Sequence, residues 1–200
     1  MITQNLLSQV ACYVTNIFNS NLPDTFYFHN LAHTLDVVNA VKEIGMNCGL
    51  DEHELGIVEM AAWFHDTGYS KIYCGHEDCS ITICFNYLLE QGLDQLTIIK
   101  IIACIASTKY PQKPQNLFEK IICDADMYHL SSDDYTRYSS KLKQEWEEHL
   151  GLHFSDEEWN EKNKNFLLNH EYFTAYGKAF FESGKKQNLM HIMDRCEIPL

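Results

Sequence analysis

Residues 61–69 of the chain read AAWFHDTGY. A run of Ala, Trp and Phe is suited to a protein core, yet here it ends in two adjacent ionisable residues, His65 and Asp66. Buried ionisable groups are costly unless they are paired, hydrogen-bonded or bound to a metal ion. The stretch therefore predicts an apolar helix that delivers an imidazole and a carboxylate together to one site.

The residues around this stretch follow a helical period. One broad apolar face between residues 51 and 66 is made by Leu55, Val58, Ala61, Ala62 and Phe64. Asp51 and Glu54 have the spacing of a capping box, in which each side chain accepts the backbone N–H of the other residue. We expect a helix over 52–66 that ends near Gly68.

The same period continues along nearly the whole chain, and no run with the two-residue period of a strand competes with it. Helix-start patterns occur at Asp94, at Ser131 with Asp134, and at Ser155 with Glu158. The expected helices are 4–19, 30–47, 52–66, 76–91, 95–107, 116–129, 132–149, 156–169 and, less regularly, 172–183. The pattern predicts an all-α bundle of about eight or nine helices, with the segment from Gly184 onward unassigned.

Length and composition favour a single globular domain. The chain has 200 residues, of which 46% are hydrophobic and 22% are charged, as in ordinary globular proteins. The formal net charge is −13, and the arginines are Arg137 and Arg195 alone, so no basic stripe for a nucleic-acid polymer is present. An acidic protein can still bind an anionic substrate when a bound metal ion supplies local positive charge.

The eight cysteines come without the signature of a secreted protein. The N-terminal sequence has no basic start followed by an unbroken apolar stretch, and the longest apolar run, IIKIIACIA at 98–106, is far too short to span a bilayer. We expect a soluble, cytoplasmic protein with reduced thiols and no membrane partner. A zinc site is disfavoured, because no C-x2-C spacing occurs among Cys74, His76, Cys79 and Cys84.

Two further stretches place ionisable residues on apolar helices. In FHNLAHTLDVV, residues 28–38, His29 and His33 are four residues apart, so on a helix they lie about 40° apart around the axis and roughly 6 Å apart along it. In EKIICDADMYHL, residues 119–130, Asp126 and His129 share one helix face and Asp124 lies nearby. Each stretch directs acid or imidazole groups toward the interior.

The chain thus presents His33, then His65 with Asp66, then an aspartate of CDADM, each on a different expected helix. In this order and context, over about residues 26–130, the sequence resembles the HD-domain phosphohydrolase superfamily. The resemblance implies one HD-type helical domain over 1–200, with a metal-site core at about 26–130 and a helical C-terminal extension at about 131–200. It also implies that the four positions bind one divalent metal ion.

Two aspartates compete for the last ligand position. The usual ending of the family motif is Ala-Asp followed by a bulky residue, which fits Ala125-Asp126-Met127 and favours Asp126. Asp124 is then a supporting neighbour or the alternative ligand. Two imidazoles and two carboxylates suit Mn, Fe, Mg or Zn. The implied metal ligands are His33, His65, Asp66 and Asp126.

A finer similarity concerns FHNLAHTLDV. It is similar to the cyclic-nucleotide phosphodiesterase branch, whose pattern is Tyr-His-Asn, two variable residues, His and then Asp-Val, with Phe28 here in place of the tyrosine. In that branch the first histidine donates a proton to the leaving oxygen and the second binds metal, which implies those roles for His29 and His33. Some bacterial HD hydrolases share this pattern, so it does not fix the substrate.

The implied activity is hydrolysis of a phosphate ester or phosphodiester of a nucleotide or another small phosphorylated compound. A bound metal ion lowers the pKa of water and so supplies hydroxide for attack at phosphorus. His29 is the expected general acid and Asp66 the catalytic carboxylate. The expected substrate contacts are Asn30 and Lys109, the latter as a point charge near phosphate.

Several alternatives stay open at this point. The chain could instead be a nucleoside-triphosphate pyrophosphohydrolase or nucleotidase, or a non-catalytic module that senses metal or nucleotide. A second metal could use His76, but the helix over 95–107 adds no histidine, so we expect one metal. The aromatic residues of the last third are expected to pack in the core, although some could wall the pocket. The oligomeric state is not predicted.

Overall fold

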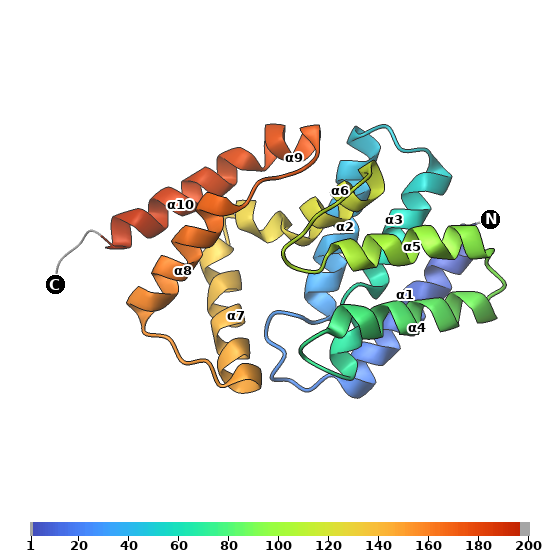
Figure 1. Ribbon diagram of the computed structural model, residues 1–200, viewed down its shortest axis with the longest axis horizontal. Helices are drawn as coiled ribbons and strands as arrows, with labels where there is room; N and C mark the ends of the chain where they lie inside the picture. The colour runs from blue at the N-terminus through green and yellow to red at the C-terminus, as the bar shows by residue number, and fades with distance from the viewer. Residues whose placement is uncertain (1, 197–200) are drawn as a thin grey trace.

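Ten α-helices and two short 3-10 helices make up the part of the chain that the computed structural model describes, residues 2–196, and this part contains no strand (Figure 1). The all-α prediction is therefore confirmed. The helices are α1 (Gln4–Asn21), α2 (Leu31–Asn47), α3 (Glu52–Phe64), η1 (Thr67–Ser70), α4 (His76–Glu90), α5 (Gln95–Ser107), α6 (Leu117–Asp126), η2 (Tyr128–Ser131), α7 (Tyr135–Leu150), α8 (Asp156–Asn169), α9 (Ala175–Phe180) and α10 (Glu182–Cys196).

Helix α3 forms the centre of the larger core. It contacts α1, α2, α5 and α6, and every residue from 56 to 64 is buried. This burial on all sides explains why the run before His65 is apolar throughout rather than amphipathic. The helix ends at Phe64, before the expected end near Gly68, so His65 and Asp66 lie at its C-terminal end, immediately before η1.

A close approach between η1 and α4 fixes this end of α3. The backbone N–H of Gly68 donates to the hydroxyl of Ser80, at 2.8 Å. A Cβ atom at position 68 would lie 1.9 Å from the backbone oxygen of His76, so the packing requires glycine there. The turn that carries Asp66 is therefore pressed directly against the start of α4.

The expected helix starts are confirmed at three positions and wrong at one. Asp51 with Glu54 and Ser155 with Glu158 form complete capping boxes, and Asp94 caps α5. Ser131 caps no helix, because its hydroxyl donates to the backbone oxygen of Tyr128 within η2 and α7 begins only at Tyr135.

The C-terminal helices form a second group beside the α1–α6 group, as Figure 1 shows. Helix α10 packs against α8, α9 and η2, around a small apolar cluster of Leu130, Tyr135, Leu167 and Ile192. The expected helix over 172–183 is instead divided between α9 and the start of α10. Helix α10 also accounts for most of the segment after Gly184 that the sequence left unassigned.

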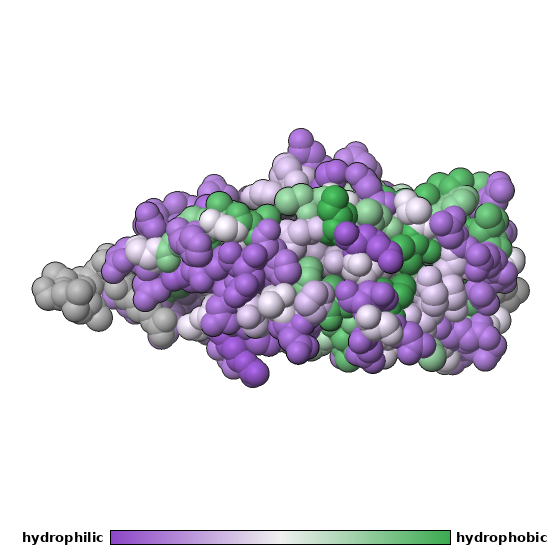
Figure 2. Space-filling model, turned by 90° about the horizontal axis from the view of Figure 1, so that it is seen from below, coloured by the Kyte–Doolittle hydropathy of each residue, from purple (hydrophilic) through white to green (hydrophobic). Residues whose placement is uncertain are grey.

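The surface differs between the two groups. In Figure 2 the face seen from below is mostly hydrophilic over the C-terminal helices and carries more apolar side chains over the α1–α6 group. Within residues 2–196, no helix combines the length and the apolar character needed to cross a membrane.

Candidate metal centre and substrate cavity

Three helix ends bring the predicted metal ligands together. His33 lies in the first turn of α2, His65 and Asp66 directly follow α3, and Asp126 is the last residue of α6. The start of α2 is fixed by Asn30, whose side-chain oxygen accepts the backbone N–H of Ala32 at 2.9 Å and of His33 at 3.4 Å. Residues distant in the chain thus converge on one point.

The distances within this cluster are those of groups that face a common centre. His33 Nε2 lies 3.2 Å from Asp126 Oδ1 and 3.6 Å from Asp66 Oδ2. His65 Nε2 lies 3.2 Å from Asp66 Oδ2 and 3.7 Å from Asp126 Oδ1. The donor atoms of His33, His65 and Asp66 all lie within 4.8 Å of one another.

Two atoms of the cluster that could bind a metal ion make no hydrogen bond to the described residues. Within residues 2–196, His65 Nε2 and Asp66 Oδ2 are buried and form no hydrogen bond. His65 Nδ1 lies 2.8 Å from the backbone oxygen of Ala62, so it carries the proton when the ring is neutral and leaves the Nε2 lone pair facing the cluster. Buried polar atoms are rarely left unpaired, and two imidazole nitrogens with two carboxylates suit a divalent cation. The residues present therefore fit a metal ion.

Electrostatics keeps the carboxylates of the cluster ionised. Burial alone would raise the pKa of Asp66, but His65, His76 and His29 together hold it well below its usual range. Burial also disfavours the charged form of His65 and would lower its pKa, but the Asp66 and Asp126 carboxylates raise it to about 9.

Asp124 faces away from this cluster. Its carboxylate accepts the backbone N–H of Phe173 at 2.7 Å and both the N–H and the hydroxyl of Thr174, at 2.9 and 2.6 Å. These bonds tie α6 to the segment that starts α9. The structure brings Asp126 rather than Asp124 to the imidazoles.

Gln112 holds the second oxygen of Asp126. Its side-chain amide donates to Asp126 Oδ2 at 3.2 Å, which leaves Oδ1 directed at His33 and His65. Gln112 lies in the irregular connection between α5 and α6. No motif in the sequence singled it out.

His29 is bound by a glutamate from the C-terminal extension. Its Nδ1 hydrogen-bonds to Glu145 on α7, and Glu145 also accepts the backbone N–H of Phe28 at 2.7 Å and of His29 at 3.0 Å. The hydroxyl of Tyr73 donates to the same carboxylate at 3.0 Å. Burial opposes the charged imidazole, but Glu145 raises the pKa of His29. Sequence reasoning missed Glu145, which lies in the polar run QEWEEH without any distinguishing pattern.

A stack of three rings connects His29 to His76. The Tyr69 ring lies 4.5 Å from the ring of His29 and 3.7 Å from that of His76, measured between centroids. His76 Nε2 is 3.3 Å from Asp66 Oδ1, the oxygen that faces away from His33 and His65. His76 thus contacts the cluster from outside, through the carboxylate of Asp66.

His129 lies beside Asp126 and lines the cavity with it. Burial and the neighbouring His33 lower the pKa of His129 to about 3, and its Nδ1 lies 3.1 Å from the backbone oxygen of Asp126. A neutral ring that donates this bond supports the end of α6. It supplies no charge to the cluster.

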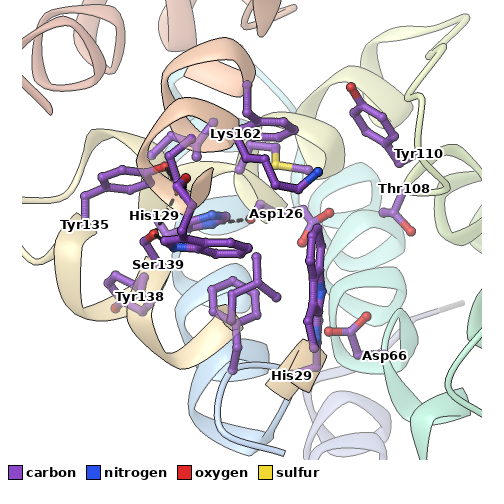
Figure 3. Close-up of a pocket in the computed structure, with 18 of the residues that line it drawn as sticks. His29, Asp66, Thr108, Tyr110, Asp126, His129, Tyr135, Tyr138, Ser139 and Lys162 are labelled. Carbon is purple, nitrogen blue, oxygen red and sulfur yellow. Dashed lines mark hydrogen bonds between the residues drawn. The ribbon is translucent and has the colours of Figure 1, made fainter. Parts of the chain in front are cut away.

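A cavity of about 660 Å³ opens in front of the cluster, as Figure 3 shows. One side carries His29, Asp66, His76 and Asp126. The other side is built by the C-terminal extension, through Tyr135, Tyr138, Ser139, Leu142, Trp146, Trp159, Lys162, Asn163, Asn165, Phe166 and Asn169. The aromatic residues of the last third therefore wall a pocket as well as filling the core.

The two predicted substrate contacts do not line this cavity. The ammonium of Lys109 is exposed and lies 3.7 Å from Asp78 Oδ2. Asn30 uses its side-chain oxygen as the cap of α2 and donates from its amide nitrogen to the backbone oxygens of Phe26 and Tyr27. The lysine that does line the cavity is Lys162. The four residues of the disfavoured zinc site, Cys74, His76, Cys79 and Cys84, form no clustered ligand set within the described chain.

Comparisons with known proteins agree with this geometry. The profile of the HD domain family matches residues 30–131, which is more than half of the chain. Comparison with curated proteins gives no significant match. Nothing in these comparisons supports the phosphodiesterase branch specifically.

Several solved structures share the fold. YpgQ of Bacillus subtilis, crystallised in complex with ADP, is 19% identical, with a TM-score of 0.68 over 94% of this chain and 95% of that one. A predicted HD superfamily hydrolase from an uncultured Thermotogales bacterium is 17% identical, with a TM-score of 0.64 over 94% and 90%. A protein from Lactobacillus plantarum is 16% identical, with a TM-score of 0.69 over 98% of both chains. These structures show the shared fold. The profile match over residues 30–131 shows that the chain belongs to the HD domain family.

Proposed function

We propose that this protein is a metal-dependent phosphohydrolase that cleaves a phosphate ester, phosphodiester or phosphoanhydride bond of a nucleotide. The observation that carries the proposal is the pair of buried atoms His65 Nε2 and Asp66 Oδ2, which lie 3.2 Å apart and form no hydrogen bond among the described residues. Asp66 also lines a cavity large enough for a nucleotide. Membership of the HD domain family supports the same chemistry.

Four residues would hold one divalent ion in this proposal: His33, His65, Asp66 and Asp126. Such an ion, when bound, lowers the pKa of water and neutralises charge on phosphoryl oxygens. Gln112 keeps the Asp126 carboxylate in place through its second oxygen. His76 does the same for Asp66.

His29 is the proposed general acid. It lines the cavity, and its side chain is 18% exposed, so a leaving oxygen can reach it. Glu145 fixes the ring by binding Nδ1, which directs the opposite nitrogen, Nε2, as the proton donor. Because Glu145 raises the pKa of His29, the imidazolium form that donates the proton is favoured.

A nucleotide is the favoured class of substrate. The cavity combines aromatic walls, suited to a base, with a metal-ligand cluster, suited to phosphate. YpgQ, which has a similar fold, was crystallised in complex with ADP. That neighbour favours a phosphoanhydride, as in pyrophosphohydrolase or nucleotidase chemistry, at least as much as the cyclic phosphodiester suggested by residues 28–37.

The test is a substrate screen on metal-loaded protein. Metal-stripped protein is reloaded with Mn²⁺ and assayed with nucleoside mono-, di- and triphosphates, cyclic mononucleotides and bis(p-nitrophenyl) phosphate. We expect turnover of at least one nucleotide that Asp66→Ala abolishes. Binding of metal and nucleotide without turnover, under Mn²⁺, Fe²⁺, Mg²⁺ and Zn²⁺ alike, would instead support a sensing module.

A further inference from the structure

Lys162 faces the metal-ligand cluster from the opposite wall of the cavity. It lies on α8, and Figure 3 shows its side chain extending into the cavity toward the wall of Thr108, Tyr110 and Asp126. Among the described residues that line the cavity, Lys162 is the one lysine or arginine, against three carboxylates, Asp66, Glu77 and Asp126. Lys162 is exposed, so its charge can be reached by a ligand that enters the cavity from solvent.

The ammonium of Lys162 has an aromatic neighbour and no carboxylate partner among the described residues. Its ammonium lies over the ring of Phe154, 5.1 Å from the centroid, and no described carboxylate forms an ion pair with it. Its neighbours are paired: Lys143 lies 2.8 Å from Asp156, and Lys164 binds Glu161. The Phe154 contact positions the ammonium while its full charge remains available to a ligand.

The cavity therefore has two sites for anionic groups, on facing walls. The metal-ligand cluster suits the phosphate that reacts, and Lys162 suits a second anionic group of the same molecule. A monophosphate would use one of these sites, whereas a di- or triphosphate can use both. Trp146, Trp159 and Phe166 line the same cavity and have ring faces suited to a base.

We infer that Lys162 binds a phosphate other than the one attached to the metal, and that the substrates are nucleoside di- or triphosphates in preference to monophosphates. This inference rests on the proposed function for its placement of the reacting phosphate. Lys162 is a specificity-determining residue in this account, and the bond cleavage itself does not require it.

The test compares two ligands and three variants by calorimetry on the Mn²⁺-loaded protein. The ligands are AMP and α,β-methylene-ADP, which differ in the second phosphate. The variants are Lys162→Gln, Lys162→Arg and, as a matched control outside the cavity lining, Lys143→Gln. Thermal unfolding of each variant confirms that it is folded.

We expect Lys162→Gln to weaken binding of α,β-methylene-ADP about tenfold or more, as loss of a charge-assisted contact does, and to change AMP binding by less than about twofold. Lys162→Arg and Lys143→Gln should bind both ligands nearly as wild type does. Equal effects of Lys162→Gln on the two ligands, no effect on either, or a wild type that binds neither would overturn the inference. Turnover is measured separately, so a protein that binds without hydrolysis contradicts the proposed function while the ratio of affinities still decides the role of Lys162.

Discussion

The carboxylate of Glu145 binds the imidazole of His29 across 116 residues of sequence, and it binds the backbone N–H groups of Phe28 and His29 as well. Glu145 is fully buried on α7. The C-terminal extension therefore does more than enclose the cavity, because it fixes the proposed general acid of the HD core.

Replacement of Glu145 by glutamine should lower kcat and shift its pH dependence. The pKa of His29 is raised by Glu145, so the amide lets it fall, and the alkaline limb of the kcat profile moves to lower pH because an acid must be protonated to act. We expect kcat to fall about tenfold to a hundredfold, with metal content unchanged. The pH–rate profiles of Glu145→Gln and of the exposed control Glu148→Gln check this, and an unshifted profile for the first would contradict it.

Asp124 should contribute to the stability of the fold and not to metal binding. Asp124→Asn places an amide group against donors from Phe173 and Thr174, so we expect unfolding to become easier by about 2 kcal/mol. Metal analysis of the folded variant should still find one ion per chain, whereas Asp126→Asn should lose it. If folded Asp124→Asn protein were metal-free and Asp126→Asn fully loaded, the assignment of the last ligand would be reversed.

Gln112 should influence metal affinity through Asp126. Gln112→Leu removes the bond to Asp126 Oδ2, and outer hydrogen bonds of this kind typically change metal affinity by about tenfold or more. Titration of Mn²⁺ into metal-stripped protein measures the effect. The control is Gln115→Leu in the same connection, because the Gln115 side chain donates only to the backbone oxygen of Lys113. Equal Mn²⁺ affinities in the two variants would contradict a role of Gln112 in metal binding.

His170 should make the fold acid-sensitive. Burial, with a contribution from Lys185, lowers its pKa from 6.5 to about 4, and neither ring nitrogen forms a hydrogen bond to any described residue. Between these values the unfolded chain binds more protons than the folded one, so stability is full above pH 6.5 and falls as the pH drops toward 4. We expect this loss to reach about 3 kcal/mol.

Denaturant unfolding at several pH values measures how steeply the free energy of unfolding changes with pH in wild type and in His170→Phe. This variant keeps a ring beside Phe166 and Tyr172. The variant should lose part of the slope. The same substitution at the exposed His53 should not change it. Parallel slopes in wild type and His170→Phe would contradict the prediction.

The sequence predicted the helices from local patterns, and the family resemblance pointed to the residues that converge on the cluster. Helical period and capping pairs need only a few neighbouring residues, and His65 with Asp66 are adjacent in an apolar run. Asp124 and Asp126 illustrate the limit of local reasoning. Two residues apart on a helix, they point about 200° apart, so only one can face the imidazoles, and the choice depends on how α6 packs.

The surroundings of the cluster could not be predicted in the same way. Glu145, Gln112 and Lys162 act through contacts that depend on where α7, the connection before α6, and α8 lie relative to the core. Lys109 was the expected phosphate contact because it follows the apolar helix α5, yet the structure directs it to Asp78. A helical period specifies which face of a helix is buried and leaves open which neighbour covers it.

We propose that one divalent ion is held by four residues, His33, His65, Asp66 and Asp126. Calorimetric titration of Mn²⁺ into metal-stripped wild type and into four single alanine variants tests it directly. We predict one site in wild type and at least a hundredfold weaker binding in each variant, since each loses a ligand. Wild-type affinity in the four variants, or no binding to wild type, would contradict the account.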